Sequence, residues 1–121
     1  MRILIVDDDP VVTTIVSMVL EEAGYEVTIA ESGEQAMQVV AGDAGFDAVV
    51  SDLNMPGIDG IELCQRLRAG GFGSPFILLS GEDPKMVRHR APELSECLAK
   101  DETLFETIAE AVARALAAGK G

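Results

Sequence analysis

Short apolar runs recur along the chain and alternate with longer stretches of mixed polarity. Each run has three or four residues, mostly aliphatic, and the five runs lie at residues 3–6, 27–30, 48–50, 76–79 and 97–99. Such runs suit strands that are covered on both faces, as in a parallel sheet, although so short a run does not by itself exclude a helix. The pattern predicts five strands.

The stretches between these runs are long enough for helices and carry helix start signals. Two of them, at residues 9–10 and 83–84, begin with an aspartate N-cap followed by proline at the first helical position. Three more carry capping boxes or close variants: Ser32 with Gln35, Asp59 with Glu62, and Thr103 with Glu106. Gly24 stands where the first helix would end, and Pro92 limits the fourth helix to roughly two turns.

Five strand and helix units in alternation predict the fold class. Short connections between them favour one α/β domain over residues 1–121, with an open parallel sheet, right-handed crossovers and helices on both faces. In such sheets the ligand site lies beyond the carboxyl ends of the strands, beside the switch point in strand order. Functional residues are therefore expected immediately after each strand.

Polar residues follow four of the predicted strands. They are Asp7, Asp8 and Asp9 after the first strand, Asp52 after the third, Ser80 after the fourth and Lys100 after the fifth. If the first and third strands are neighbours, three of the carboxylates converge, and Asp9 is left to cap its helix. Two carboxylates about 4 Å apart repel by roughly 4 kcal/mol at an effective dielectric near 20, so the cluster requires a cation.

The chemistry of this set points to phosphoryl transfer. Carboxylate oxygens without histidine or cysteine favour Mg²⁺, which usually recruits a phosphate oxygen as a further ligand. The ammonium of Lys100 and the hydroxyl of Ser80 would bind the remaining phosphoryl oxygens. Each residue alone has an ordinary structural role as a cap, a turn residue or a solvated charge. The arrangement at four strand ends is what favours a site.

Two segments resemble a known family. Residues 3–10, ILIVDDDP, and residues 52–60, DLNMPGIDG, are similar to the signature of response regulator receiver domains of two-component systems, and the resemblance covers essentially the whole chain. It implies a flavodoxin-like doubly wound (βα)5 fold with strand order 2-1-3-4-5. It also implies that Asp52 is the phosphoacceptor. Asp8, Asp52 and the main-chain carbonyl of Asn54 would bind Mg²⁺ directly, and Asp7 would act through water. Ser80 would take the place of the family's switch hydroxyl, and Lys100 that of its lysine.

The resemblance is incomplete after the fifth strand. Asp101 follows Lys100 where the family usually has proline in a cis peptide. A non-proline cis bond costs about 2.5–4 kcal/mol, so the turn is either trans or strained. Cys97 replaces the usual Tyr or Phe that turns inward on phosphorylation, so the signal is expected to travel through the backbone after Ser80 and the basic residues 88–90.

The residue two positions after Ser80 bears on the lifetime of the phosphoryl group. In the family, this side chain and the one two positions after the phosphoacceptor flank the approach of water. Here they are Glu82 and Asn54, both able to hydrogen-bond water, which resembles fast-resetting chemotaxis regulators. The pair predicts a short-lived phosphoryl group.

Charge and composition narrow the function classes. With 21 acidic and 9 basic residues the net charge is −12, which disfavours direct binding to nucleic acid or to anionic membranes. The start lacks a secretory signal and no run is long enough to span a bilayer, so a cytoplasmic location is expected. Cys64 and Cys97 have no metal-site spacing and are expected to be reduced. The basic residues 88–90 form either a solvated surface or a docking patch for an acidic partner.

Three functions remain to be distinguished. The first is a signalling module that takes a phosphoryl group from a histidine kinase or histidine phosphotransfer protein and catalyses only its own phosphorylation and dephosphorylation. The second is a small Mg²⁺-dependent phosphohydrolase, for which the chain leaves no room for a substrate cap. The third is a receiver-like module that only binds partners.

The predicted helix over residues 10–20 carries no charge, so it either exposes an apolar patch to the phosphodonor or is buried. The output is either a separate partner or an attached domain.

Overall fold

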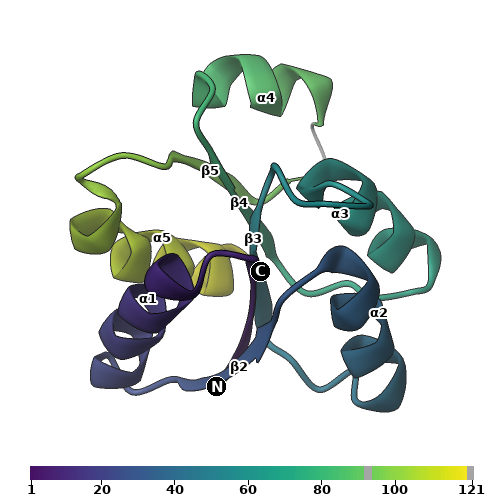
Figure 1. The fold of residues 1–121 in the computed structure, drawn as a ribbon. Helices are drawn as coiled ribbons and strands as arrows, with labels where there is room; N and C mark the ends of the chain where they lie inside the picture. The colour runs from purple at the N-terminus through teal and green to yellow at the C-terminus, as the bar shows by residue number, and fades with distance from the viewer. Residues whose placement is uncertain (92–93, 120–121) are drawn as a thin grey trace.

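The computed structural model describes residues 1–91 and 94–119 and contains a central sheet between two layers of helices (Figure 1). The elements in chain order are β1 (Arg2–Val6), α1 (Pro10–Glu22), β2 (Glu26–Ala30), α2 (Gly33–Gly42), β3 (Ala48–Asp52), α3 (Gly60–Ala69), β4 (Phe76–Ser80), α4 (Pro84–Arg90), β5 (Glu96–Ala99) and α5 (Leu104–Gly119). All strand pairs are parallel and the sheet order is β2-β1-β3-β4-β5. The predicted fold class and strand order are confirmed.

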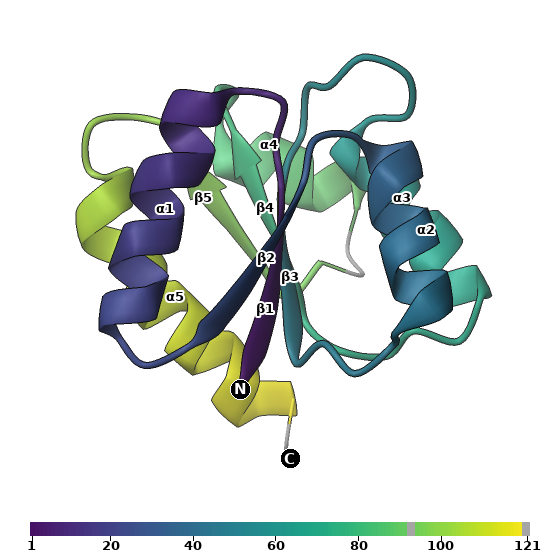
Figure 2. The same ribbon diagram turned by 60° about the horizontal axis from the view of Figure 1, so that its bottom comes forward.

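The alternation of side chains along the strands divides the core into two layers. Ile3 and Ile5 of β1 face α1 and α5, while Leu4 and Val6 face α2, α3 and α4. Figure 2 shows α1 and α5 together on one side of the sheet and α2 and α3 on the other. β1, β3 and β4 are buried along almost their whole length, but β2 and β5 are the sheet edges and are only partly covered. Burial on both faces therefore applies to the three central strands.

Most of the predicted helix caps form in the structure. Asp9, Ser32, Asp59 and Asp83 each accept a hydrogen bond from a backbone N–H in the first turn of the helix that follows, and α1 ends before Gly24, which has φ 98°. The start of α5 differs, because the Thr103 hydroxyl donates to Asp101 at 2.6 Å and Asp101 also accepts from the Thr103 N–H at 2.9 Å. α4 ends at Arg90 after two turns, as expected, although Pro92 itself lies outside the described residues.

Candidate active site

The carboxyl ends of the central strands bring three carboxylates together. Asp7 and Asp8 follow β1 and Asp52 ends the neighbouring β3, so that one oxygen from each lies within 4.8 Å of the other two. Asp7 is 1% exposed and Asp52 is 5% exposed, whereas Asp8 is open to solvent. A cavity of about 270 Å³ beside Asp7 and Asp8 opens toward the start of α1 and the end of β2. The strand order therefore produces the predicted convergence.

Lys100 reaches two of these carboxylates. Its Nζ lies 3.0 Å from Oδ2 of Asp52 and 3.1 Å from Oδ2 of Asp7. Partial burial lowers the pKa of this ammonium, but the hydrogen bonds to Asp52 and Asp7 outweigh burial and leave the pKa above its usual value. The two carboxylates therefore favour the charged form of Lys100.

The turn after β5 delivers this lysine without a cis bond. The peptide bonds of the described residues are all trans, including the one between Lys100 and Asp101. The Lys100 N–H donates to the Ser80 carbonyl at 2.7 Å, which ties the end of β5 to the end of β4. Of the two alternatives left open by the sequence, the unstrained trans turn is the one present. Asp101 stabilises this turn through Thr103 and takes the place of the usual proline.

The charge of the cluster suits a divalent cation. Three carboxylates face one ammonium, which leaves two negative charges without a partner in the cluster. The pKa of Asp7 is raised, first by burial and then by the charge of Asp52. The hydrogen bond from the Asp9 N–H and the contact with Lys100 lower this pKa, but they do not cancel the rise. Neighbouring negative charge of this kind is relieved by a metal ion, and hard oxygen donors fit Mg²⁺.

The loop after β3 is held in place from two sides. Gly60 begins α3 directly against the end of β3, where a Cβ atom would overlap the carbonyl oxygen of Asp52. On the outer side, the Ile58 N–H donates to the Glu34 carboxylate of α2 at 3.3 Å. Asn54 lies in this loop, two residues beyond Asp52, with an exposed side chain. Its carbonyl as a metal ligand stays a prediction.

Ser80 ends β4, the strand next to β3, and Glu82 follows it two residues later. The Ser80 side chain is fully buried, and its Oγ accepts a hydrogen bond from the Glu82 N–H at 2.9 Å. The Glu82 carboxylate is half-exposed and pairs with Arg90 at 3.3 Å. Neither the pairing of Glu82 with Arg90 nor the contact of Glu34 was predicted from the sequence. The ion pair could have been predicted, because Glu82 and Arg90 carry opposite charges at the two ends of a two-turn helix. The contact of Glu34 with Ile58 joins residues 24 positions apart and has no local signature.

Cys97 occupies a half-buried position on β5. It packs against the core layer beneath α2, α3 and α4, opposite Leu78 of β4. Burial raises the pKa of its thiol, and the charge of Arg88 lowers it by a smaller amount. A side chain of this size leaves the switch position without an aromatic ring. Its role in signalling stays a prediction.

Comparison with known proteins decides the family. The model of the response regulator receiver domain family matches residues 3–112. The chain belongs to this family. The receiver TrrA of Thermotoga maritima, solved in complex with Mg²⁺-BeF, is 31% identical with a TM-score of 0.82, and the match covers 93% of this chain and 96% of that one. Chemotaxis protein CheY4 of Vibrio cholerae is 29% identical with a TM-score of 0.84 and covers 94% and 97%.

The curated relatives are longer proteins. Response regulator MprA of Mycolicibacterium vanbaalenii is 42% identical over 82 residues, which is 68% of this chain and 35% of MprA. Transcriptional regulatory protein TcrA of Mycobacterium tuberculosis is 40% identical over 79 residues, or 65% and 31%. This receiver thus matches about a third of the length of these relatives.

Phosphoryl acceptance is the function of receiver domains, and the aspartate cluster of this receiver suits Mg²⁺, which is present as Mg²⁺-BeF in the structure of TrrA. Within residues 1–91 and 94–119, none of the helices combines the length and the apolar character that a bilayer crossing demands.

Proposed function

We propose that this receiver accepts a phosphoryl group on Asp52 from a histidine kinase or histidine phosphotransfer protein. Asp7, Asp8, Asp52 and the carbonyl of Asn54 would hold Mg²⁺, and Ser80 and Lys100 would bind phosphoryl oxygens. The observation that carries the proposal is the geometry around Asp52, a buried carboxylate with Lys100 Nζ at 3.0 Å and two further carboxylates within 4.8 Å. Response regulators typically work in the cytoplasm, and the proposal extends this location to the chain.

The transfer itself is a substitution at phosphorus. One Asp52 oxygen forms a bond to phosphorus while the bond from phosphorus to the histidine nitrogen breaks, and the electron pair of that bond stays on the imidazole. Mg²⁺ would supply charge neutralisation for the phosphoryl oxygens in this site. Asp7 positions Lys100, whose ammonium balances the charge that develops on the phosphoryl group. The Ser80 hydroxyl is close to the same strand ends and donates to another phosphoryl oxygen.

Labelling by a small phosphodonor tests this proposal. With Mg²⁺ and such a donor, intact-mass spectrometry is expected to show one phosphoryl adduct that is stable in acid and labile in base. Removal of Mg²⁺ with a chelator is expected to abolish the adduct, because the carboxylates then repel the incoming phosphoryl group. An absence of labelling at saturating Mg²⁺ would favour a module that only binds partners. Steady turnover of a phosphomonoester would instead favour the phosphohydrolase.

The surface of α1 supports a protein phosphodonor. Val11 and Met18 are 64% and 62% exposed, two turns apart on the same helix, and Ile29 at the end of β2 is 41% exposed. Val12, Val16, Val19 and Leu20 of the same helix pack against α5 and the sheet. These exposed apolar side chains support the predicted apolar patch on α1, and we propose this surface as the contact for the phosphodonor.

Met18→Lys is expected to lower kcat/KM for phosphotransfer from a kinase or phosphotransfer protein about tenfold, because a charge replaces exposed apolar contact area. Labelling by a small phosphodonor is expected to remain at the wild-type rate. Met86→Lys is the matched control, since Met86 on α4 is 66% exposed and lies on another surface. Equal phosphotransfer to the two variants would exclude α1 as the contact.

Glu82→Leu is expected to slow self-dephosphorylation about tenfold, or 1.4 kcal/mol, because the variant loses a group that orients water toward the Asp52 acyl phosphate. Phosphate release after rapid removal of the donor measures this rate. Arg90→Gln breaks the same ion pair but keeps the carboxylate, so it is expected not to slow the reaction. If Glu82→Leu decays as fast as the wild type while Asp101→Pro decays faster, the turn that carries Lys100 sets the lifetime instead.

The output of the receiver depends on what it contacts or is joined to. MprA and TcrA are named as a response regulator and a transcriptional regulatory protein, and most of their length lies beyond the region matched here. We propose that this receiver acts on a partner protein or an attached domain through the surface of α4 and β5, and that the receiver itself does not bind nucleic acid because its net charge is −12.

A further inference from the structure

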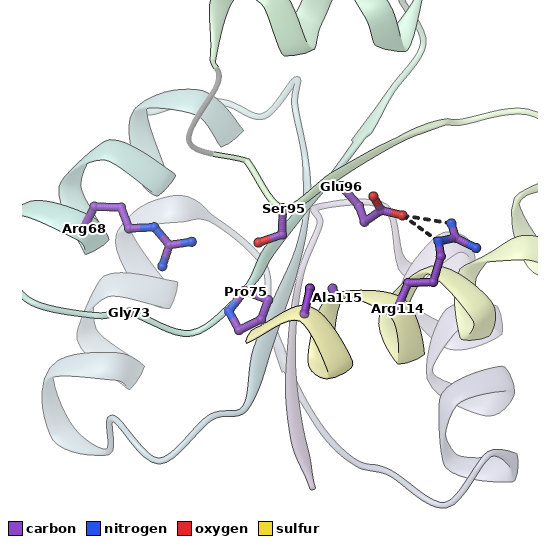
Figure 3. A pocket seen from close by; sticks show the side chains of 8 residues that line it. Arg68, Gly73, Pro75, Ser95, Glu96, Arg114 and Ala115 are labelled. Atoms are coloured by element: carbon purple, nitrogen blue, oxygen red, sulfur yellow. Dashed lines mark hydrogen bonds and ion pairs between the residues drawn. The ribbon is translucent and has the colours of Figure 1, made fainter. Parts of the chain in front are cut away.

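A second cavity lies at the edge of the sheet opposite the carboxylates. Its volume is about 350 Å³, and it is lined by the end of α3, the starts of β4 and β5 and the end of α5 (Figure 3). β4 runs from Phe76 at this edge to Ser80 beside Asp52, a rise of about 13 Å over its five residues. The cavity is therefore separate from the proposed phosphorylation site.

The guanidinium of Arg68 is held rigidly at this cavity. Its Nη1 donates to the carbonyls of Phe72 and Ser74, at 2.9 and 2.5 Å, which uses both N–H groups of that nitrogen. Nε and Nη2, which form the side edge of the guanidinium, have no hydrogen-bond partner among the described residues. In Figure 3 the guanidinium and the hydroxyl of Ser95 point toward each other across the cavity. Arg68 thus presents a preorganised pair of parallel donors to the open space.

The carboxylate that lines the cavity, Glu96, pairs with other arginines rather than with Arg68. Arg114 donates to Oε1 of Glu96 from two nitrogens, at 3.0 and 2.8 Å, and Nη1 of Arg88 lies 3.7 Å from Oε2 of the same carboxylate, so Glu96 is already paired with two other arginines. Within residues 1–91 and 94–119, no carboxylate lies within ion-pair distance of Arg68. Ser95 Oγ accepts from the Phe76 N–H at 3.1 Å, and its own proton is left for another acceptor.

The remaining walls are small and apolar. Pro75, Ala115 and Ala118 line the cavity opposite the donors. The volume is near the lower end of the range of about 300–1,000 Å³ for small-molecule sites, so the space fits a ligand of few atoms. The carboxyl ends of α3 and α5 are nearby and carry partial negative charge, which disfavours an anion. Binding of an anion here therefore depends on the guanidinium of Arg68.

We propose that this cavity binds the carboxylate of a small organic acid with a short apolar body. The parallel Nε and Nη2 donors of Arg68 match a planar carboxylate in bidentate geometry. The negative charge of the carboxylate pairs with the guanidinium of Arg68, which has no ion-pair partner among the described residues. The Ser95 hydroxyl supplies a third donor, and the apolar body packs on Pro75 and Ala115. This inference is independent of phosphorylation at Asp52.

Titration with isobutyrate, followed by amide and arginine side-chain NMR at constant ionic strength, tests the proposal. Saturable shifts are expected at Gly73, Ser95 and the Nε–H of Arg68. Arg68→Gln is expected to weaken binding about tenfold, since it removes the charged donors. Arg66→Gln is the matched control, because Arg66 is on the same helix but is exposed and pairs with Glu62.

A second variant keeps the test decisive if loss of Arg68 loosens the loop that it holds. Ala118→Met places a larger side chain at the wall of the cavity and does not change the residues that Arg68 contacts, so it is expected to weaken the binding of isobutyrate as well. The proposal is overturned if chloride reproduces the shifts, if Arg68→Gln or Ala118→Met binds like the wild type, or if inorganic phosphate binds more tightly than isobutyrate. In the last case the site takes a tetrahedral oxyanion.

Discussion

Asp52→Asn is expected to form no phosphoryl adduct under conditions that label the wild type completely. The amide has nearly the shape of the carboxylate but is not a nucleophile toward phosphorus, so the loss is expected to be all or none. Asp59→Asn is the control, because Asp59 belongs to the same loop, is exposed and caps α3. Intact-mass spectrometry of both variants measures the outcome. Equal labelling of Asp52→Asn and the wild type would place the phosphoacceptor elsewhere.

Asp52→Asn is also expected to stabilise the protein, whereas most substitutions of buried residues destabilise it. Asp52 is surrounded by two carboxylates and one ammonium, so its neutralisation removes two repulsions and one attraction. We expect the free energy of unfolding without Mg²⁺ to rise. We also expect Mg²⁺ to stabilise the variant less than the wild type, because a ligand stabilises only as far as it binds the folded state. Urea unfolding at several Mg²⁺ concentrations measures both effects.

Lys100→Met is expected to slow labelling by a small phosphodonor by about 10²–10³-fold, the usual cost of removing one preorganised donor to a developing negative charge. It is also expected to destabilise the protein without Mg²⁺, since Asp7 and Asp52 then lack their shared ammonium. Breaking a fully buried pair costs about 3–5 kcal/mol, and we expect about 1–3 kcal/mol here because Lys100 is 24% exposed.

Mg²⁺ separates the two roles of this lysine. Excess Mg²⁺ is expected to restore much of the lost stability, because it also neutralises the carboxylates, but labelling is expected to remain slow. Lys85→Met, at an exposed lysine of α4, is the matched control and is expected to leave both quantities unchanged. A variant at Lys100 that is labelled at the wild-type rate would mean that the ammonium serves stability alone.

The helix next to this site is weakly anchored. α4 buries only Val87 among its seven residues, and the charges at its end pair with Glu82 and Glu96 across exposed surface. Exposed ion pairs contribute little free energy, so this helix is poorly held by comparison with α1 or α5. With Cys97 in place of an aromatic ring, the prediction remains that the signal travels through the backbone after Ser80.

Local patterns in the sequence determined the elements of this protein and the identity of its candidate residues. Apolar runs of three or four residues specify strands because a central parallel strand is covered on both faces, and the aspartate and serine caps mark helix starts because they satisfy free N–H groups. These signals depend on neighbours in the chain. They located all five strands and the starts of all five helices, although Thr103 does not cap α5 as predicted.

Tertiary structure decided what depends on distant neighbours. Which strands became edges, and how far Lys100 extends toward Asp7 and Asp52, follow from strand order and from the turn at Asp101, which a local pattern does not encode. The same holds for the contact of Glu34 with the loop after β3 and for the hydrogen bonds that hold Arg68 at the second cavity. Such contacts join residues far apart in the chain, and the free energy that selects them comes from packing of the whole core rather than from local preference.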